Sequence, residues 1–220
     1  MYCIELGITI QGSKHRWLQT NPMIVAAFDF DGTLTRNDTM FPFLRHVAGR
    51  WKYVANIVAA TPGLCSYALG RTENQVAKEQ LFGHFLKGLR KQDIEQMGRE
   101  FALSGIPRML RVDAVEKLRW HLNEKHYCVL LSASLDVYVS HWAQQMGFDD
   151  IACSRLQFDS QGIATGYLDG KNCYGPEKVR RLEQLLDRKT VSVLYAYGDS
   201  RGDKELLALA DQPFYRHFSG

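Results

Sequence analysis

Short apolar runs alternate along the chain with segments whose apolar residues recur at helical spacing. The strand candidates are Ile24–Asp29, Tyr127–Ser132, Ile151–Cys153, Val191–Tyr197 and, more weakly patterned, Phe214–Phe218. Helical spacing follows at Leu135–Met146, Pro176–Asp187 and Lys204–Ala210. Strands that alternate with helices build a parallel sheet with both faces covered. The pattern therefore predicts a doubly wound, Rossmann-like α/β domain, which binds ligands beyond the carboxyl ends of its strands.

Two segments break this alternation. Residues 37–125 are almost wholly of helical pattern, and within them Thr72 and Gln75 have the spacing of a capping box. We expect this segment to form a helical cap inserted after the first strand. Residues 155–170 alternate around a glycine and predict a small hairpin. The predicted division is an N-terminal extension of residues 1–22, a core of residues 23–36 and 126–220, and a cap of residues 37–125.

The first 22 residues do not resemble a signal peptide. Their basic cluster follows the short apolar stretch instead of preceding it, and no small-residue cleavage site is present. Because Met23 opens the first convincing strand, one hypothesis is that translation starts there. An intact mass that includes residues 1–22 would contradict it.

Composition and charge narrow the class of partner. The chain carries 27 Lys and Arg against 24 Asp and Glu, a net charge of +3, and its basic residues are scattered. This is too little positive charge to indicate nucleic acid, so we expect a small-molecule partner. The five cysteines form no C-x-x-C pair, which argues against a disulfide framework and a structural zinc site and fits the reducing cytoplasm.

Paired aspartates follow two of the strand candidates. In "FDFDGTLT", Asp29 and Asp31 would point to the same side of an extended strand, with Phe28 and Phe30 on the other side. In "YGDSRGDKELL", Asp199 and Asp203 follow the strand candidate that ends near residue 197. Like-charged carboxylates held close together need a compensating cation. Carboxylates at two strand ends, with water and phosphate, suit Mg²⁺.

A third strand end and a helix start predict an anion site. Ser132 in "VLLSAS" would lie where a helix N-terminus favours phosphate. Ser134 would either bind phosphate through its backbone N–H or cap that helix. Lys178 in "YGPEKVRRL" lies in the first turn of a helix, where its charge would hold phosphate and keep a neighbouring carboxylate ionised.

The order of these motifs, "DFDGTLT", serine, lysine and "GDSRGD", resembles the haloacid dehalogenase superfamily. The resemblance covers residues 23–211 and is closest to the phosphoserine phosphatase-like branch, which inserts a helical cap after the first motif. It implies a phosphatase that works through an aspartyl-phosphate intermediate. Asp29 would be the nucleophile, and Asp31 would protonate the leaving alcohol and then deprotonate water. Since halide departure needs no proton, Asp31 favours phosphatase over dehalogenase.

The resemblance also implies ligands for the metal and for the phosphoryl group. Mg²⁺ would be held by the Asp29 carboxylate, the Asp31 main-chain carbonyl and Asp199, with Asp203 acting indirectly or through water. Ser132 and Lys178 would bind the phosphoryl oxygens. A catalytically silent phosphate-binding relative is a remote alternative, because neither the nucleophile nor the lysine is missing from this sequence.

The cap carries the signals for substrate choice. Asp38 matches an acidic position that helps phosphoserine phosphatases to bind their substrate, and an N-cap of the first cap helix is the alternative. Residues 53–70 hold no charge, lie between Lys52 and Arg71, and are interrupted at Pro62. They predict either a buried pair of cap helices or an apolar lid that touches membrane.

These alternatives lead to two substrate classes. The leading one is a small soluble phosphomonoester of the phosphoserine type, handled in the cytoplasm. The other is a lipid phosphate at the membrane surface, because some relatives with a similarly apolar insert dephosphorylate phosphatidylglycerophosphate. His121, His126 and His141 show no metal spacing and are expected on surfaces, as is Arg201.

Overall fold

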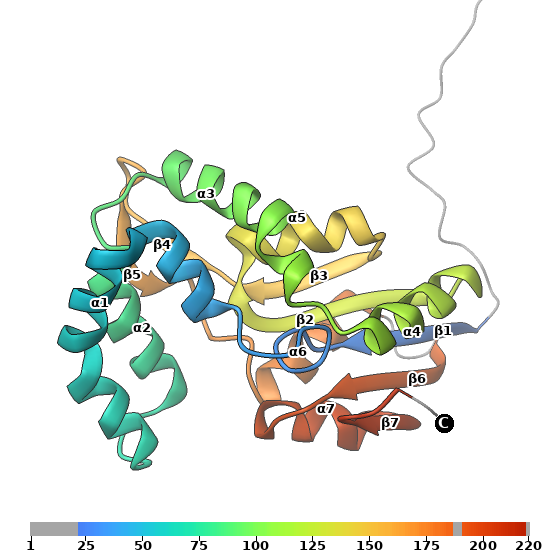
Figure 1. Ribbon diagram of the computed structural model, residues 1–220. Coiled ribbons are helices and arrows are strands. Elements are labelled where there is room, and N and C mark those ends of the chain that lie inside the picture. Colours follow the sequence, from blue (N-terminus) through green and yellow to red (C-terminus); the bar gives the residue numbers. More distant parts are fainter. Residues whose placement is uncertain (1–21, 187–190, 219–220) are drawn as a thin grey trace, which may run out of the picture.

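A five-stranded parallel sheet organises the protein in this computed structural model, which describes residues 22–186 and 191–218 (Figure 1). The strand order is β3-β2-β1-β6-β7, and every pairing is parallel. The strands are β1 (Met23–Phe28), β2 (Tyr127–Leu135), β3 (Asp150–Ser154), β6 (Val191–Gly198) and β7 (Gln212–Tyr215). The first 21 residues lie outside the described part of the chain. The hypothesis that translation starts at Met23 therefore stays a prediction.

Alternate residues of the central strands supply two separate cores. On one face, Ala26 and Phe28 join a cluster with residues of α4 (Val112–Asn123) and α5 (Asp136–Met146). On the other face, Val25 and Ala27 pack with α6 (Pro176–Leu185) and α7 (Lys204–Leu209). Figure 1 shows α5 above the strands and α7 below them. The predicted doubly wound α/β core is therefore confirmed.

The last strand begins and ends two to three residues earlier than the apolar pattern predicts. β7 runs from Gln212 to Tyr215, where Phe214 is paired with Tyr197 of β6. Arg216 adopts a positive φ of 63°, and its N–H donates to the carbonyl of Gly198. This turn ends the strand before Phe218, which packs back against the core instead.

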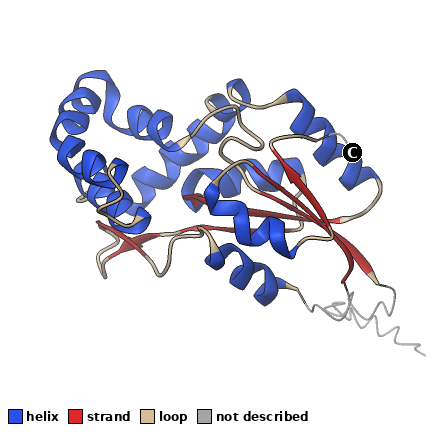
Figure 2. Ribbon diagram, turned by 90° about the horizontal axis from the view of Figure 1, so that it is seen from below, coloured by secondary structure: helices blue, strands red, loops and turns tan. Residues whose placement is uncertain are grey.

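The segment between β1 and β2 is helical, as predicted. It consists of α1 (Met40–Ala68), α2 (Asn74–Phe85), α3 (Lys91–Ser104), a short 3₁₀ turn (Ile106–Arg108) and α4. Figure 2 shows helices of this segment gathered beyond one end of the sheet. The chain before α1 meets the chain before α4, because Thr35 forms a β-bridge with Leu110 and Arg111 N–H donates to the Leu34 carbonyl at 2.9 Å.

The predicted hairpin is present and packs against the helical segment. It consists of β4 (Leu156–Phe158) and β5 (Ala164–Leu168), which pair antiparallel. β5 lies along α2, and α3 lies along α5 of the core. The cysteines that the structure describes, Cys65, Cys128, Cys153 and Cys173, are all free thiols, as expected for this part of the chain.

The predicted capping box does not form. α2 begins at Asn74, and its N-cap residue, Glu73, makes no side-chain capping bond. Thr72 shares a hydrogen bond with Ser66 at 2.6 Å. The Gln75 amide instead donates to the Gly170 carbonyl and accepts from the Asn172 N–H, so it binds the core and is not free to cap the helix.

The prediction of a buried helix pair over residues 53–70 is wrong. α1 continues through Pro62 and changes direction only at Gly49, whose φ of 71° and ψ of 169° are not helical. Among residues 53–70 only Ala60 is buried, whereas Val58 is 67% exposed. One side of this helix packs on α2, and nothing described covers the other side. No helix in the described part of the chain is long and apolar enough to cross a membrane.

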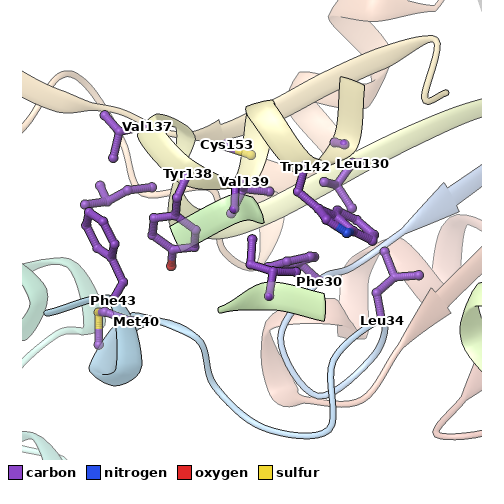
Figure 3. Close-up of a cluster of buried hydrophobic side chains, with 14 of the residues drawn as sticks. Phe30, Leu34, Met40, Phe43, Leu130, Val137, Tyr138, Val139, Trp142 and Cys153 are labelled. Atoms are coloured by element: carbon purple, nitrogen blue, oxygen red, sulfur yellow. The ribbon is translucent and has the colours of Figure 1, made fainter. Parts of the chain in front are cut away.

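An aromatic cluster fastens the start of α1 to the core. The rings of Phe43 and Tyr138 lie 4.5 Å apart between centroids, and Phe30 packs on Trp142 at 5.1 Å. Figure 3 shows Phe43 of α1 and Phe30 of the loop after β1 meeting the side chains of α5. The Tyr138 hydroxyl also lies 3.1 Å from the hydroxyl of Thr39, next to the strand ends.

His121 is buried, so its predicted surface position is wrong. Its Nε2 lies 2.9 Å from the Tyr197 hydroxyl, and its Nδ1 lies 2.7 Å from Nδ1 of His126. Burial lowers the pKa of His121 to about 3, with His126 adding to the effect. The residue faces the sheet because α4 packs against β2, a contact that the sequence pattern does not reveal.

Candidate active site

Asp29 lies at the tip of β1 in a tightly hydrogen-bonded loop. Its N–H donates to the Tyr197 carbonyl at 2.9 Å, and the Phe30 carbonyl accepts the N–H of Leu34 at 2.8 Å. The Asp29 side chain is buried and accepts a hydrogen bond from the Thr33 hydroxyl at 3.0 Å. The loop therefore fixes this carboxylate in a single position.

Asp31 is held by a different set of donors. One of its carboxylate oxygens accepts from both the N–H and the hydroxyl of Thr39, at 2.7 and 2.6 Å, and the other accepts from the Ser134 hydroxyl. Burial, followed by the charge of Asp38, raises the pKa of Asp31. The strand ends at Phe28, so simple alternation does not govern the direction of Asp31, which binds partners on the cap side of the loop.

Lys178 reaches the site from the first turn of α6. Its ammonium donates to Asp29 and, at 2.6 Å, to Asp203, and only 2% of the residue is exposed. Although burial alone lowers the pKa of Lys178, these two carboxylates raise it above its usual value. Burial raises the pKa of Asp29 to about 7 against the opposing pull of Lys178. The lysine is therefore a permanent cation in contact with Asp29.

Asp203 organises the loop that follows β6. One oxygen binds Lys178, and the other accepts from Asp199 N–H at 3.2 Å, Ser200 N–H at 3.0 Å and the Ser200 hydroxyl at 2.8 Å. This loop brings Asp199 against Gly32. A Cβ on Gly32 would lie 2.2 Å from a carboxylate oxygen of Asp199, and the φ of Gly32 is +76°. Only glycine fits this close approach.

The site contains an acidic cluster of the kind that holds a metal ion. Asp29, Asp199 and Asp203 each offer an oxygen, and these oxygens all lie within 4.8 Å of one another. Burial, followed by the charge of Asp203, raises the pKa of Asp199. A bound cation would relieve this repulsion, and the oxygen-only donor set fits a hard divalent ion such as Mg²⁺.

Ser132 and Ser134 end β2 beside these carboxylates. Ser132 is fully buried, and its hydroxyl oxygen accepts the N–H of Ser134 at 3.0 Å. Ser134 turns its own hydroxyl to Asp31. The N-cap of α5 is Leu135, so the helix-cap interpretation of Ser134 is wrong. The structure thus brings both serines to the predicted site, where Ser134 binds Asp31 and Ser132 binds Ser134.

Two residues of the cap, Asp38 and Lys78, lie next to the side chains at the strand ends. The Asp38 carboxylate accepts from the N–H of Met40 at 2.8 Å, so it binds the first turn of α1. The N-cap residue is Thr39, so the interpretation of Asp38 as the N-cap is wrong. Lys78 of α2 donates to the Ala133 carbonyl at 2.7 Å. Burial lowers the pKa of Lys78, while the charges of Asp31 and Asp38 oppose that effect. Arg201 is exposed, as expected.

Lys78 is a site residue that sequence reasoning missed, as it missed the donors Thr33 and Thr39. It lies in "NQVAKEQL", where nothing distinguishes it from the other charged residues of an amphipathic helix. The partial burial of a lysine next to the buried Ala77 is visible only after α2 has packed over the strand ends.

The family model for haloacid dehalogenase-like hydrolases matches residues 26–208, which include every residue of this candidate site. The chain belongs to this family. Among curated proteins, Protein CicA of Caulobacter vibrioides strain NA1000 is 39% identical over 200 residues, covering 90% of this chain and 88% of that protein. These matches confirm the predicted superfamily and the prediction that the chain is a hydrolase.

Solved structures of related proteins show the same fold. A Bordetella pertussis Tohama I protein of unknown function superposes with a TM-score of 0.78 at 24% identity, covering 89% of this chain and 90% of the other. A substrate-bound phosphoserine phosphatase gives a TM-score of 0.63 at 19% identity, with 86% and 83% covered. The haloacid dehalogenase-like chain thus has the fold of the phosphoserine phosphatase-like branch, as predicted.

Proposed function

We propose that the protein is a Mg²⁺-dependent phosphomonoester hydrolase that forms an aspartyl-phosphate intermediate. The observation that carries this proposal is the pairing of two differently held carboxylates. Asp29 is fixed by Lys178 and Thr33, while Asp31 is held by Thr39 and Ser134 within the same loop. One is arranged as a nucleophile and the other as a proton donor.

Two displacements account for the reaction. A carboxylate oxygen of Asp29 attacks phosphorus, the bond to the alcohol oxygen breaks, and Asp31 gives that oxygen its proton. Water then attacks the same phosphorus, Asp31 takes the proton from that water, and Asp29 leaves as a free carboxylate. The raised pKa of Asp31 keeps a proton available for the first step.

The remaining residues hold the phosphoryl group and the metal. Mg²⁺ would be bound by the carboxylates of Asp29 and Asp199 and by the main-chain carbonyl of Asp31, and when bound it neutralises phosphate charge. Asp203 holds Lys178 and the loop that follows β6 in place. It would bind the metal ion through a water molecule. Lys178 and Ser132 bind the phosphoryl oxygens.

The leading substrate class is a small soluble phosphomonoester of the phosphoserine type. Lys78 and Asp38 support it because they bring one cation and one anion from the cap to the site. A leaving group that carries both a carboxylate and an amine would meet a group of opposite charge at each. We place this activity in the cytoplasm.

A lipid phosphate is the second candidate. The observation that favours it is the exposed apolar side of α1, where Trp51 is 81% exposed and Val58 67%. A cap with such a face could receive part of an acyl chain while the headgroup phosphate reaches Asp29.

The deciding experiment measures phosphate release from phosphoserine and from phosphatidylglycerophosphate in mixed micelles, each with and without Mg²⁺. We expect Mg²⁺-dependent release, with preference for phosphoserine. Preference for the micelles would replace the leading substrate class by the lipid one. No release from either compound, or release that ignores Mg²⁺, would contradict the proposed function.

The matched variant is Asp29→Asn, which is nearly isosteric but cannot attack. We expect its turnover to fall by about 10⁴-fold or more. Asp169→Asn, an exposed aspartate on the hairpin side of the molecule, is the control and should keep wild-type turnover. Near-normal turnover of Asp29→Asn would remove Asp29 from the nucleophile role.

A further inference from the structure

A stripe of uncovered apolar residues runs along α1 after the break at Gly49. Its members recur every three or four residues, so they share one side of the helix. They are Trp51, Val54, Val58, Pro62, Cys65 and the C-cap residue Leu69. All of them are exposed, and Trp51, Val58 and Leu69 are exposed by 81%, 67% and 67%. We call this surface the α1 stripe.

The charged residues within α1 and the turn after it are all basic. Between Asp38 and Glu73 the sequence contains no acidic residue and four basic ones, Arg45, Arg50, Lys52 and Arg71. All four are exposed, and they form no ion pair with any carboxylate in the described ranges. Three of them lie at the two ends of the α1 stripe, which has uncharged residues between.

We propose that the α1 stripe docks the protein onto the surface of an anionic lipid bilayer. A helix with one apolar side and basic residues around it lies in the plane of the interface, with its apolar side among the lipid chains and its charges at the headgroups. Trp51 has the residue type that favours this boundary. The helix from residue 50 to residue 68 would lie flat over about 28 Å.

The packing of α1 allows this docking without unfolding. The opposite side of the helix is occupied. The ring of Tyr53 lies tilted against that of Phe85 of α2, with 5.7 Å between centroids, and both Ile57 and Leu64 pack against the core cluster. Figure 1 shows α1 and α2 side by side, away from the sheet. The α1 stripe is therefore a second surface of the cap, separate from the side that faces the strand ends.

The same charges argue against a second copy of the chain as the occupant. If two α1 stripes packed antiparallel, Arg50 and Lys52 of one copy would meet Arg71 of the other. If they packed parallel, each basic residue would meet its own equivalent. Either arrangement sets like charges against each other at both ends of the contact, which disfavours association. An anionic bilayer matches both ends.

The first experiment is co-sedimentation of the full chain with vesicles of phosphatidylcholine alone or of phosphatidylcholine with phosphatidylglycerol. We expect binding to the anionic vesicles, and its loss in Trp51→Ser combined with Val58→Ser. The control is Leu103→Ser, which changes a side chain of similar exposure, 62%, on α3. Catalysis is not measured, so the outcome is independent of the proposed function.

The second experiment tests the charges. In Arg50→Gln combined with Lys52→Gln, binding to anionic vesicles should weaken about fivefold for each charge removed. Lys204→Gln, an exposed lysine of α7, is the control and should bind like wild type.

Three results would overturn the proposal. The first is equal binding to neutral and anionic vesicles, and the second is stripe variants that bind like wild type. The third is an absence of vesicle binding together with a dimer that Trp51→Ser dissociates, which would assign the α1 stripe to a second copy.

Discussion

Lys178 is enclosed by two carboxylates in a place that water scarcely reaches. Its ammonium binds Asp29 and Asp203, and all three side chains are buried. Buried ions of opposite sign tolerate each other only while the set is complete, because each has left its hydration behind. The stability of the fold therefore depends on all three charges being present, in addition to any role they have in the reaction.

Replacement of Lys178 by methionine should destabilise the protein. The change keeps the length of the side chain but leaves Asp29 and Asp203 facing each other without a cation, and we expect a loss of about 3–5 kcal/mol in the free energy of unfolding. Urea denaturation without added metal measures it. Lys204→Met, at an exposed position, is the control, and similar losses in both variants would contradict the argument.

Individual site residues can be predicted from the sequence where they lie next to the end of a strand or the start of a helix. Asp29, Asp31, Asp199, Ser132 and Lys178 could be placed because each follows an apolar run or begins a helix. Lys78 and the burial of His121 could not be, because both depend on how a helix packs against something distant in sequence.

Among the contacts between helices, α3 and α5 approach each other closely. A Cβ on Gly98 of α3 would lie 2.0 Å from the main-chain oxygen of Val137 on α5. Because that oxygen belongs to backbone, it cannot rotate aside as a flexible side chain would. The absence of a side chain at Gly98 is what lets the cap approach the core here.

Gly98→Ala should therefore destabilise the protein, although alanine favours helices. The control is Gly83→Ala on α2, where a Cβ meets nothing within 4 Å. We expect that control to stabilise by about 0.5–1 kcal/mol through helix propensity. Thermal unfolding of both variants gives the comparison, and a stabilised Gly98→Ala would show that the two helices separate at little cost.

His121 couples α4 to the sheet in a way that depends on pH. Its pKa is about 3 in the folded protein and near its ordinary value, about 6.5, in the unfolded chain. The unfolded chain therefore binds the extra proton as pH falls below about 6.5, and stability should decline by up to about 1.4 kcal/mol for each pH unit.

Unfolding free energies from urea denaturation at about pH 5 and about pH 7.5 should show this decline in the wild type. In His121→Asn the part of the slope due to this proton should be absent. The matched control is His84→Asn, which changes an exposed histidine of α2. An unaltered slope in His121→Asn would mean that the histidine is not kept neutral by folding.

Elements are well predicted where periodicity and burial agree. The central strands and α5, α6 and α7 follow the apolar pattern closely. Residues 53–70 mislead because a lack of charge predicts burial, whereas α1 packs mainly on α2 and less on α3, and most of residues 53–70 stay uncovered. Pro62 misleads as well, since α1 continues through it.

The whole molecule depends on ties between cap and core that lie outside the aromatic cluster. Asn172 carries several of them. Its side-chain amide nitrogen donates to Asn74 of α2, and its side-chain amide oxygen accepts from the Ser154 hydroxyl. Its main-chain N–H donates to the side chain of Gln75. The bonds to Asn74 and Gln75 join α2 to the loop that leads toward Lys178, and the bond from Ser154 holds that loop on β3.

Asn172→Leu should loosen the cap while the sheet stays folded. The side-chain bonds to Asn74 and Ser154 are lost, so amide hydrogens of α2 should exchange faster than in the wild type, while those of β1 should not change. The control is Asn123→Leu at the end of α4, away from these ties. Uniform acceleration over the whole chain would instead indicate global destabilisation.

The sequence predicts a cap and a core but not how they are joined. The hairpin β4–β5 is predicted correctly, yet its contact with α2 rests on pairings between residues about 90 positions apart. No local pattern encodes such a pairing. The predicted division at residues 37 and 125 thus describes the order of elements, while α3, α4 and the hairpin connect the two parts in space.

The bridge between Thr35 and Leu110 has a consequence for the order in which the chain folds. β1 and β2 are neighbours in the sheet although about a hundred residues separate them, and loops of that length close slowly. Once the bridge forms, the effective loop shrinks to about 25 residues, which lowers the entropic barrier to pairing by about 1 kcal/mol. The same bridge makes residues 36–109 one inserted unit in chain order. Evolution could therefore lengthen, shorten or exchange that unit without altering the register of the sheet, which makes it the natural place for substrate range to diverge.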